Sequence, residues 1–571
     1  MNAFDVDHIS LAITVKVRCP FLFPGLDAGR FGLDAAALRD IEGHPLIPAD
    51  QMRGVLRHAL RDIADAGKFD SAELAAMFGR GSADARGSED ESADAFAPER
   101  GRLHFTDLVM QDLGVSTVGN RVRIDKKTGA AESGGLLFVE LVTEQGSEAT
   151  FRGQIVIHAS EERSATWIAA LQAARTRISA MGAMKSAGYG EIVSIEIEPD
   201  PDSKRPLFKE CEVPPDVVFF QLAIDRPFLV DARRAADNVY VGSTVIPGGA
   251  LKGLLARHLE LMGRLDEETS ASLTDLRISH ARADGERSAM PLSLIAAGTT
   301  IRDALGVPSG SGAMIGNEAV TFSTDWKPEQ SEAARHALGW GAPVELDRSV
   351  RMHVEIAQDT GTAKDQQLFI ANAVDPGTRR WTTQIDFSSI KNDSHRRLFV
   401  GILEAGMDGL GRTGARVDFE RIEVPAKAAR PVGDDPNRFA VVLETDALMA
   451  SPSDGTDAKD AYAAYWARVF PGVVLENFYA SQRLAGGYIA RRYCSGAYAP
   501  FWLTEAGSIF LLSGEGLADK IPELLRYGLP APVIGDQCTT WQTCPFQPEN
   551  GYGAIAADYD PTELWSEVRH V

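Results

Sequence analysis

Basic residues, a proline-led loop and a glycine-rich turn occur together in this chain, and they do so twice. Lys and Arg side chains and exposed backbone N–H groups bind phosphates, so each set has a use in holding a nucleic-acid backbone. The first set is HPLIPADQMRGVLRHAL (44–60), NRVRIDKKTGAAESGGLLF (120–138) and GAMKSAGYGEI (182–192), and the second is STVIPGGALKGLLARHL (243–259), RSVRMHVEIAQDTGTAKDQQLF (348–369) and GLGRTGAR (409–416). The order and chemistry repeat after about 200 residues, which indicates a duplicated domain.

Each proline-led loop, at 47–54 and 246–253, predicts the start of a helix. Proline fixes φ and ends the preceding strand, and the following helix presents unpaired N–H groups in its first turn. Those groups, together with Arg53 in the first copy or Lys252 in the second, would hold a phosphate. The alternative is an ordinary strand-to-helix connection.

The glycine-rich turns also carry polar and basic side chains. The first contains Lys185, Ser186 and Tyr189 between Gly182, Gly188 and Gly190, and the second contains Arg412 and Arg416 around Gly409, Gly411 and Gly414. Glycines at this density permit positive φ and expose N–H groups, which creates concavities for anions. Neither turn has the context of a dinucleotide-binding or Walker motif.

The middle segments begin with basic residues and turn at a Thr-Gly pair, which predicts a strand leading into a hairpin. In the first copy the basic patch consists of Arg121, Arg123, Lys126 and Lys127, and its counterparts in the second copy are Arg348, Arg351 and His353. The alternative is a solvated edge strand that is protected by charge.

The elements around these motifs predict an α+β unit over residues 1–200. Met52, Val55, Leu56 and Ile63 recur at helical spacing, and Asp50 is a candidate cap for that helix. The remaining predicted elements are strands at 9–17, 102–110, 136–142, 151–159 and 191–199 and a helix at 164–179. The order β–α–β–β–α–β is typical of a ferredoxin-like unit with insertions.

Two further units follow the first. A Pro- and charge-rich linker at 199–216 leads to a second unit at 217–425, which opens with the apolar strand 217–224. A second linker at 426–438 leads to the segment 439–571. Gly551-Tyr552-Gly553 in that segment echoes Gly188-Tyr189-Gly190, so we interpret it as a third, more divergent unit.

Composition restricts the possible partners and location. The chain has 571 residues, 44% of them hydrophobic, and a net charge of −22, so a nucleic-acid partner requires a local basic groove on an acidic body. The acidic stretch 81–100 is expected to be a solvated or disordered loop. No long apolar run or secretory signal is present, which favours a cytoplasmic protein with no membrane partner. The five cysteines are scattered and predict neither a disulfide framework nor a zinc site.

Taken together, these motifs resemble the RAMP superfamily of CRISPR-associated proteins, which build the backbone of type III RNA-guided effector complexes. The family pattern is a strand, an IPGSSLKG-type loop opening a helix, an RxxIDxxTGxAxxGxLF segment and a closing glycine-rich loop. All four parts stand in residues 1–200, and residues 217–424 repeat them. The resemblance implies tandem ferredoxin-like (RRM-like) RAMP domains with insertions. The first loop departs from the pattern by reading PADQ, and its Asp50 would repel a phosphate.

The first copy resembles the repeating backbone subunit of that family, in which an Asp in a loop before the proline motif cuts target RNA. Asp34 stands at the matching position of FGLDAAALRDIEGHPLIP (31–48), and Asp27 is a weaker candidate nearby. Asp40, six residues after Asp34, is expected to cap a turn. One carboxylate in such a loop suits a Mg²⁺ ion, or another divalent cation, that helps to activate a ribose 2′-OH. Asp34 is therefore the expected catalytic and metal-binding residue.

The second copy resembles the guide-capping, large RAMP subunit of type III-D systems. Thr244 before the proline motif fits that branch, as does the stretch 483–512, which contains Arg491 and Arg492. These two arginines are further candidates for RNA contact. Asp237 precedes its proline motif by a shorter distance than Asp34 does, so whether this copy also cleaves RNA stays open.

The resemblance implies a subunit that binds CRISPR guide RNA, target RNA and other type III effector subunits, and that cuts target RNA with a metal. Two alternatives remain at this level. One is a non-catalytic scaffold with the same RNA contacts. The other is a metal-independent endoribonuclease that processes the guide, for which the candidate histidines are His8, His44, His58 and His104.

Overall fold

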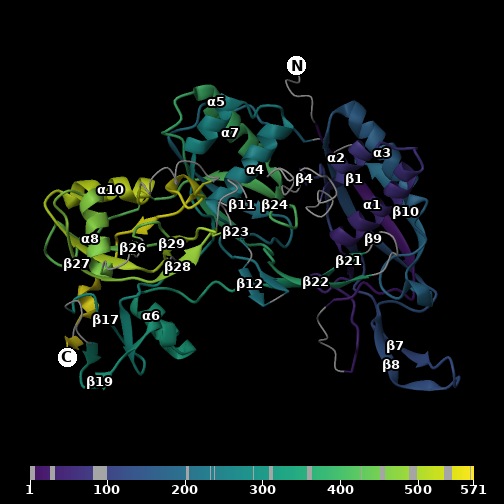
Figure 1. Cartoon of the computed structure of the whole chain (residues 1–571), viewed down its shortest axis with the longest axis horizontal. Helices are drawn as coiled ribbons and strands as arrows, with labels where there is room; N and C mark the ends of the chain where they lie inside the picture. Colours follow the sequence, from purple (N-terminus) through teal and green to yellow (C-terminus); the bar gives the residue numbers. More distant parts are fainter. Residues whose placement is uncertain are drawn as a thin grey trace.

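The structure is a computed structural model, in which three antiparallel sheets succeed one another along the chain (Figure 1). It describes residues 7–25, 32–80, 99–200, 205–231, 233–236, 238–286, 289–307, 313–356, 363–425, 427–450, 457–487, 498–532, 543–565 and 568–570. The mixture of helices and strands agrees with the predicted α+β class. No helix within these ranges is both long and apolar enough to cross a bilayer.

The first sheet has the strand order β10-β1-β9-β6-β2, and β5 also pairs with β9. Its strands are β1 (Asp7–Arg18), β2 (Leu46–Ile47), β5 (Leu103–Phe105), β6 (Leu108–Met110), β9 (Glu148–Ala159) and β10 (Glu191–Pro199). The central strand β1 runs antiparallel to β9 and β10, and Ile13 lies opposite both Gly153 and Ile197. Alternate residues of β1, from Leu11 to Val17, point into the core because side chains alternate across a strand.

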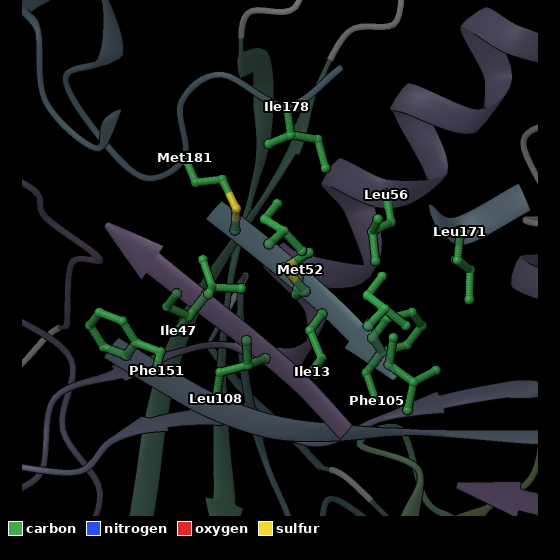
Figure 2. Close-up of a cluster of buried hydrophobic side chains, with 14 of the residues drawn as sticks. Ile13, Ile47, Met52, Leu56, Phe105, Leu108, Phe151, Leu171, Ile178 and Met181 are labelled. Carbon is green, nitrogen blue, oxygen red and sulfur yellow. The ribbon is translucent and has the colours of Figure 1, made fainter. Parts of the chain in front are cut away.

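Three helices accompany this sheet, namely α1 (Ala49–Asp65), α2 (Ser71–Phe78) and α3 (Glu161–Arg175). Met52 and Leu56 of α1 lie in one buried cluster with Ile13 of β1 and Leu171 of α3 (Figure 2). The prediction that Asp50 caps α1 is wrong, because the cap position is occupied by Pro48 and Asp50 lies inside the first turn. The N–H of Ala49 instead donates to Oδ1 of Asp107, 2.8 Å away.

The second and third sheets have the orders β14-β23-β11-β25-β24 and β27-β30-β26-β31. The second contains β11 (Val217–Ile224), β14 (Arg277–Ile278), β15 (Arg282–Ala283), β23 (Arg380–Asp386), β24 (Met407–Leu410) and β25 (Ala415–Ile422), with α4 (Gly248–Leu261), α5 (Glu267–Asp275) and α7 (Asp393–Ala405). The third contains β26 (Arg438–Leu443), β27 (Val474–Tyr479), β30 (Ile509–Ser513) and β31 (Ile555–Ala556), with α8 (Ala458–Val469) and α10 (Leu517–Tyr527).

One arrangement recurs in all three sheets. In each sheet four strands lie side by side, as β10-β1-β9-β6, β25-β11-β23-β14 and β31-β26-β30-β27. Numbered among themselves in chain order, each set of four has the spatial order 4-1-3-2. A helix follows the first strand and another follows the third strand in each case. The three largest buried clusters draw on residues 9–197, 207–419 and 439–557, so each sheet has a core of its own.

Smaller sheets extend from these cores. Two matter for the site: the hairpin of β7 (Thr117–Ile124) and β8 (Ala131–Leu141), and the four-stranded sheet of β12 (Arg233–Ala236), β13 (Val239–Val241), β22 (Ala363–Val374) and β21 (Arg348–Ile356). The others are β3 (Gly79–Arg80) with β4 (Glu99–Arg100), β16 (Leu294–Ala297) with β17 (Thr300–Asp303) and β20 (Thr321–Phe322), β18 (Ala313–Ile315) with β19 (Glu318–Ala319) and β32 (Val568–His570), and β28 (Gln482–Ala485) with β29 (Phe501–Thr504), and the helix α6 (Pro328–Ala337) lies beside β17.

Candidate nucleic-acid interface

The basic hairpin and the glycine-rich turn of the first unit meet at one pair of side chains. The guanidinium of Arg121 on β7 lies over the ring of Tyr189, 5.1 Å from its centroid. The same side chain donates through Nη1 to the carbonyl oxygen of Ala187 at 3.3 Å. Tyr189 itself is buried, so the Arg121 guanidinium packs on a ring that is largely shielded from solvent. Two segments that the sequence singled out separately are therefore adjacent in space.

Cationic and apolar side chains are exposed together on the hairpin, which projects from the body (Figure 1). Arg123, Lys126 and Lys127 are exposed on it, and Lys185 and Ser186 are exposed in the neighbouring turn. The exposed apolar side chains of the hairpin are Val118, Val122, Ile124, Leu136 and Phe138. Cations can neutralise phosphates and apolar groups can pack on bases, so this surface has both components of a single-strand contact.

The loop that carries Asp34 is fastened to the base of this hairpin. Oδ2 of Asp34 accepts a hydrogen bond from the N–H of Phe138 on β8 at 2.7 Å, and the N–H of Asp34 donates to the carbonyl oxygen of Phe138 at 2.8 Å. Asp34 is otherwise exposed. The carboxylate is therefore oriented by backbone contacts and stands beside the hairpin that carries the basic patch.

A divalent cation at Asp34 would have this single carboxylate as its protein ligand. Mg²⁺ usually keeps several waters and takes one or two protein carboxylates together with substrate phosphates, so a single exposed Asp is a sufficient protein ligand. Among the described residues, two groups of side chains are close enough to share a metal ion, His8–His158–Asp408 and Asp40–Glu42–His44, and neither includes Asp34. Asp40 caps a local turn, because its Oδ1 accepts from the N–H of His44 at 2.7 Å.

The start of α1 is covered by protein. Asp107, which accepts a hydrogen bond from the N–H of Ala49, also forms a bidentate ion pair with Arg351 of β21. Nη1 and Nη2 of Arg351 donate to Oδ1 and Oδ2 of Asp107 at 2.9 and 2.6 Å. Although burial opposes its ionisation, the Arg351 guanidinium lowers the pKa of Asp107. Arg53 donates to the carbonyl oxygen of Phe78. A phosphate at this helix start would have to displace a carboxylate, so the geometry does not support the predicted cradle or a phosphate contact by Arg351.

The start of α4 is also closed. The N–H of Gly248 donates to Nδ1 of His280 at 3.2 Å, and a Cβ at this glycine would collide with the carbonyl oxygen of Ile278. Lys252 donates through Nζ to the carbonyl oxygen of Thr274 at 3.1 Å, and burial lowers the pKa of its ammonium group to about 8. Lys252 therefore packs against its own unit, and the predicted cradle at 246–253 does not fit either.

Arg412 and Arg416 have different environments although they are close in sequence. Arg416 is buried and pairs with Asp408 at 3.1 Å and with Asp418 at 2.8 Å, so it is engaged inside the fold. Arg412 is exposed and lies over the ring of Tyr240, 4.8 Å from its centroid.

An aromatic stack continues from Tyr240 across the four-stranded sheet. Tyr240 contacts Phe369 edge-on at a centroid distance of 6.1 Å, and Phe369 stacks on His353 at 4.8 Å. His353 in turn lies 3.5 Å from a carboxylate oxygen of Asp50 in α1. The stack therefore spans the two units. Asp27, Asp237, Arg491, Arg492 and most of the acidic stretch 81–100 lie outside the described residues.

Sequence reasoning missed a buried histidine cluster between the first two sheets. His8, His104 and His158 come from β1, β5 and β9, whereas His258 and Asp408 come from α4 and β24. Burial lowers the pKa of His104 well below its ordinary value. His8 is buried and His104 is half-buried, and both contact His158 inside the protein, so they are poorly placed for acid–base attack on RNA. Strand alternation could have signalled inward-facing positions, but not their convergence.

Comparisons with known proteins give one family match and several distant structural likenesses. No curated protein matches the chain. A cryo-EM structure of the type III-B Cmr-beta complex bound to cognate target RNA contains a chain that is 20% identical, with a TM-score of 0.24, over 34% of this chain and 61% of that one. A second Cmr-beta structure, bound to cognate target RNA and AMPPnP, gives 11% identity and a TM-score of 0.28 over 51% of this chain and 86% of that one.

The apo state of the Cmr-beta complex gives 14% identity and a TM-score of 0.23, over 35% of this chain and 98% of that one. The family match is confined to the first unit, where it begins in β1 and ends in β10 and so includes the hairpin and the glycine-rich turn described above. Residues 14–193 match the model of the RAMP superfamily.

Proposed function

We propose that this chain is a CRISPR RNA-binding subunit of a type III RNA-guided effector, in which its partners are guide RNA, target RNA and other effector subunits. The RAMP match and the repeated motifs support this function. The strand order common to the three sheets supports tandem ferredoxin-like units at 1–200, 217–425 and 439–571. On this proposal the first unit is of the backbone type, and the second and third together cap the guide.

The observation that carries the proposal is the position of Arg121 over Tyr189, which joins the basic hairpin to the glycine-rich turn. The chain has a net charge of −22, so RNA must bind where cations gather locally. The RNA-contacting residues of the first unit are then Arg121, Arg123, Lys126, Lys185 and Ser186, with Arg412 in the second unit. Such contacts read the backbone, and base pairing between guide and target supplies sequence specificity.

Target RNA is cleaved, on this proposal, next to Asp34. Its carboxylate would hold a divalent cation, and the backbone N–H of Phe138 fixes the orientation of that carboxylate. A cation held there would supply charge neutralisation at the scissile phosphate and would lower the pKa of the attacking hydroxyl. The hairpin cations hold the strand so that one phosphate stands beside Asp34.

Two variants test this role in the assembled effector with target RNA and Mg²⁺. Asp34→Ala removes both the charge and the acceptor for Phe138, whereas Asp34→Asn removes the charge and keeps an acceptor. We expect both variants to retain guide RNA and to lose target cleavage. If both cleave like the wild type, the chain is a non-catalytic scaffold. Cleavage by Asp34→Asn alone would show that the residue only positions the loop.

A further inference from the structure

A cleft lined by arginines lies between the first two units. It has a volume of about 950 Å³ and is bordered by α2, β4, α4 and the glycine-rich turn after β24. Figure 1 shows α4 and β24 beside β4 at this junction. Its cationic side chains are Arg100, Arg102, Arg257 and Arg412. Arg257 and Arg412 lie in the repeated motifs of the second unit, whereas Arg100 and Arg102 lie outside the repeated motifs.

Two of these arginines are held in place by the backbone of the neighbouring unit. Arg100 of the first unit donates through Nη1 to the carbonyl oxygen of Gly409 in the second, at 2.8 Å. Arg257 of the second unit donates through Nη2 to the carbonyl oxygen of Arg100 at 3.0 Å, and through Nη1 to Glu260 at 2.7 Å. The two units therefore bring their guanidinium groups to a common cleft in a fixed arrangement.

The positive charges in this cleft are not fully neutralised. Burial, followed by repulsion from neighbouring guanidinium groups that include Arg257, lowers the pKa of both Arg100 and Arg102. The carboxylates in the lining are Glu99, Asp231 and Glu260, against the four arginines. A bound anion would relieve this repulsion between like charges.

A second large cleft at the same junction has the opposite character. Its volume is about 1190 Å³, and its carboxylates outnumber its arginines. The carboxylates are Asp40, Glu42, Asp107, Glu140, Asp225, Asp347 and Asp375, and the arginines are Arg39, Arg226, Arg348 and Arg351. An anionic strand that crosses from one unit to the other is therefore drawn to the arginine-lined cleft and repelled by the other.

Two glycines in the lining of the arginine-lined cleft leave its surface without side chains at their positions. Gly253 on α4 has no atom within 4 Å of the position that a Cβ would take, so the helix surface there is open. Gly411 has a φ of +64°, and a Cβ there would lie 2.5 Å from the carbonyl oxygen of Leu229. The turn that presents Arg412 thus depends on glycine, and a strand backbone can approach α4 closely.

We infer that the arginine-lined cleft binds consecutive phosphodiester groups of an RNA strand where that strand passes from the first unit to the second. The inference rests on the proposed RNA-binding function. Arginine forks pair with phosphate oxygens in a defined geometry. The adjoining stack of Arg412, Tyr240 and Phe369 offers a face on which a base beside these phosphates can stack.

The test measures binding of the full chain to a fluorescent single-stranded RNA of fixed sequence at several KCl concentrations. Arg102→Gln and Arg412→Gln each remove one cleft charge, and Arg177→Gln removes a charge from an exposed position after α3. Each phosphate contact contributes about 0.7 to the slope of log K against log [KCl] for single strands. We expect the magnitude of this negative slope to fall by about 0.7 in each cleft variant and by about 1.4 in the double variant Arg102→Gln/Arg412→Gln. Arg177→Gln should leave the slope unchanged.

Arg102→Lys is the control for loss of the arginine side chain without loss of its charge. It should keep most of the salt slope. If the wild type binds RNA with a steep salt dependence and the double variant matches it, the cleft inference is overturned and the proposed function stands. If the wild type binds no RNA, both are overturned. The cleft inference is also overturned if the cleft holds a small phosphate ester instead of RNA. In that case AMP would raise the melting temperature of the wild type but not of the double variant, and the double variant would keep the wild-type salt slope for RNA binding.

Discussion

Asp408 on β24 and His158 on β9 are in contact inside the protein, with Oδ2 of the carboxylate 3.2 Å from Nε2 of the imidazole. The same oxygen lies 3.1 Å from Nε2 of His8 and 3.1 Å from Nη1 of Arg416. Although burial opposes its ionisation, the hydrogen bond from His158 and the close imidazole of His8 hold the pKa of Asp408 well below its usual range. One carboxylate of the second unit thus anchors two strands of the first.

Replacing Asp408 by Asn should destabilise the junction strongly. The change leaves the buried guanidinium of Arg416 without its buried counter-charge, and breaking a buried pair in this way costs about 3–5 kcal/mol. Asp418→Asn is the matched control, because Asp418 pairs with the same Arg416 but its side chain is 53% exposed, and it should cost less than about 1 kcal/mol. Urea unfolding of the full chain measures both, and equal losses would contradict the account.

Acid should loosen the same junction. Burial, with a contribution from His158, lowers the pKa of His258 from 6.5 to about 4. The folded chain therefore binds fewer protons than the unfolded chain between these values, so stability falls as the pH drops through that window. His258→Gln keeps an acceptor for the N–H of Asp408 and removes this titration. Within the window, the unfolding free energy of His258→Gln should fall less steeply with decreasing pH than that of the wild type. The two slopes should differ by about 1.4 kcal/mol per pH unit. An unchanged slope of unfolding free energy against pH would refute this.

Two glycines of the first turn should respond differently to alanine. Gly188 has a φ of +82° and no atom within 4 Å of a Cβ, so Gly188→Ala costs only backbone strain, about 1 kcal/mol. Gly190 has a φ of +73°, and its Cβ would collide with the carbonyl oxygen of Met181, so Gly190→Ala should cost about 3 kcal/mol or more. Thermal unfolding of the two variants distinguishes them, and similar losses would show that the turn can relax.

The tip of the β7–β8 hairpin should contribute to RNA affinity but not to folding. Lys126 and Lys127 are exposed, so the double change to Gln removes two charges without disturbing the core. We expect an unchanged melting temperature and a salt slope for RNA binding whose magnitude is lower by at least about 0.7, which is the contribution of Lys126. The matched control is Lys68→Gln, at an exposed position after α1. Wild-type affinity and slope in the double variant would exclude the hairpin tip from the RNA path.

Local patterns predicted the elements well. The strands 191–199 and 217–224 coincide with β10 and β11, and the helix expected at 164–179 appears as α3 over Glu161–Arg175. Its start differs because the side chain of Ser160 accepts from the N–H of Arg163 and begins the helix earlier. Alternation and helical spacing are local properties, so sequence alone can identify such elements.

The environment of individual cations could not be predicted in the same way. Arg416 and Arg412 belong to one short motif, yet one pairs with a buried carboxylate and the other lies over Tyr240. Likewise Ala49 is capped by Asp107 from a later segment and not by Asp50. Such partners depend on strand register and on how the units pack, which a local pattern does not encode. The role of Asp34 was implied by family resemblance, whereas its place beside the hairpin and its bond to Phe138 became visible only in the structure.

The most direct test of the central proposal is the RNA that accompanies the protein. The full chain, expressed with its effector partners and a CRISPR array, would be purified, and the bound nucleic acid would be measured by its absorbance ratio and sequenced. The account predicts a discrete RNA species that carries repeat-derived sequence. A complex free of nucleic acid, or one with a random sample of cellular RNA, would contradict it.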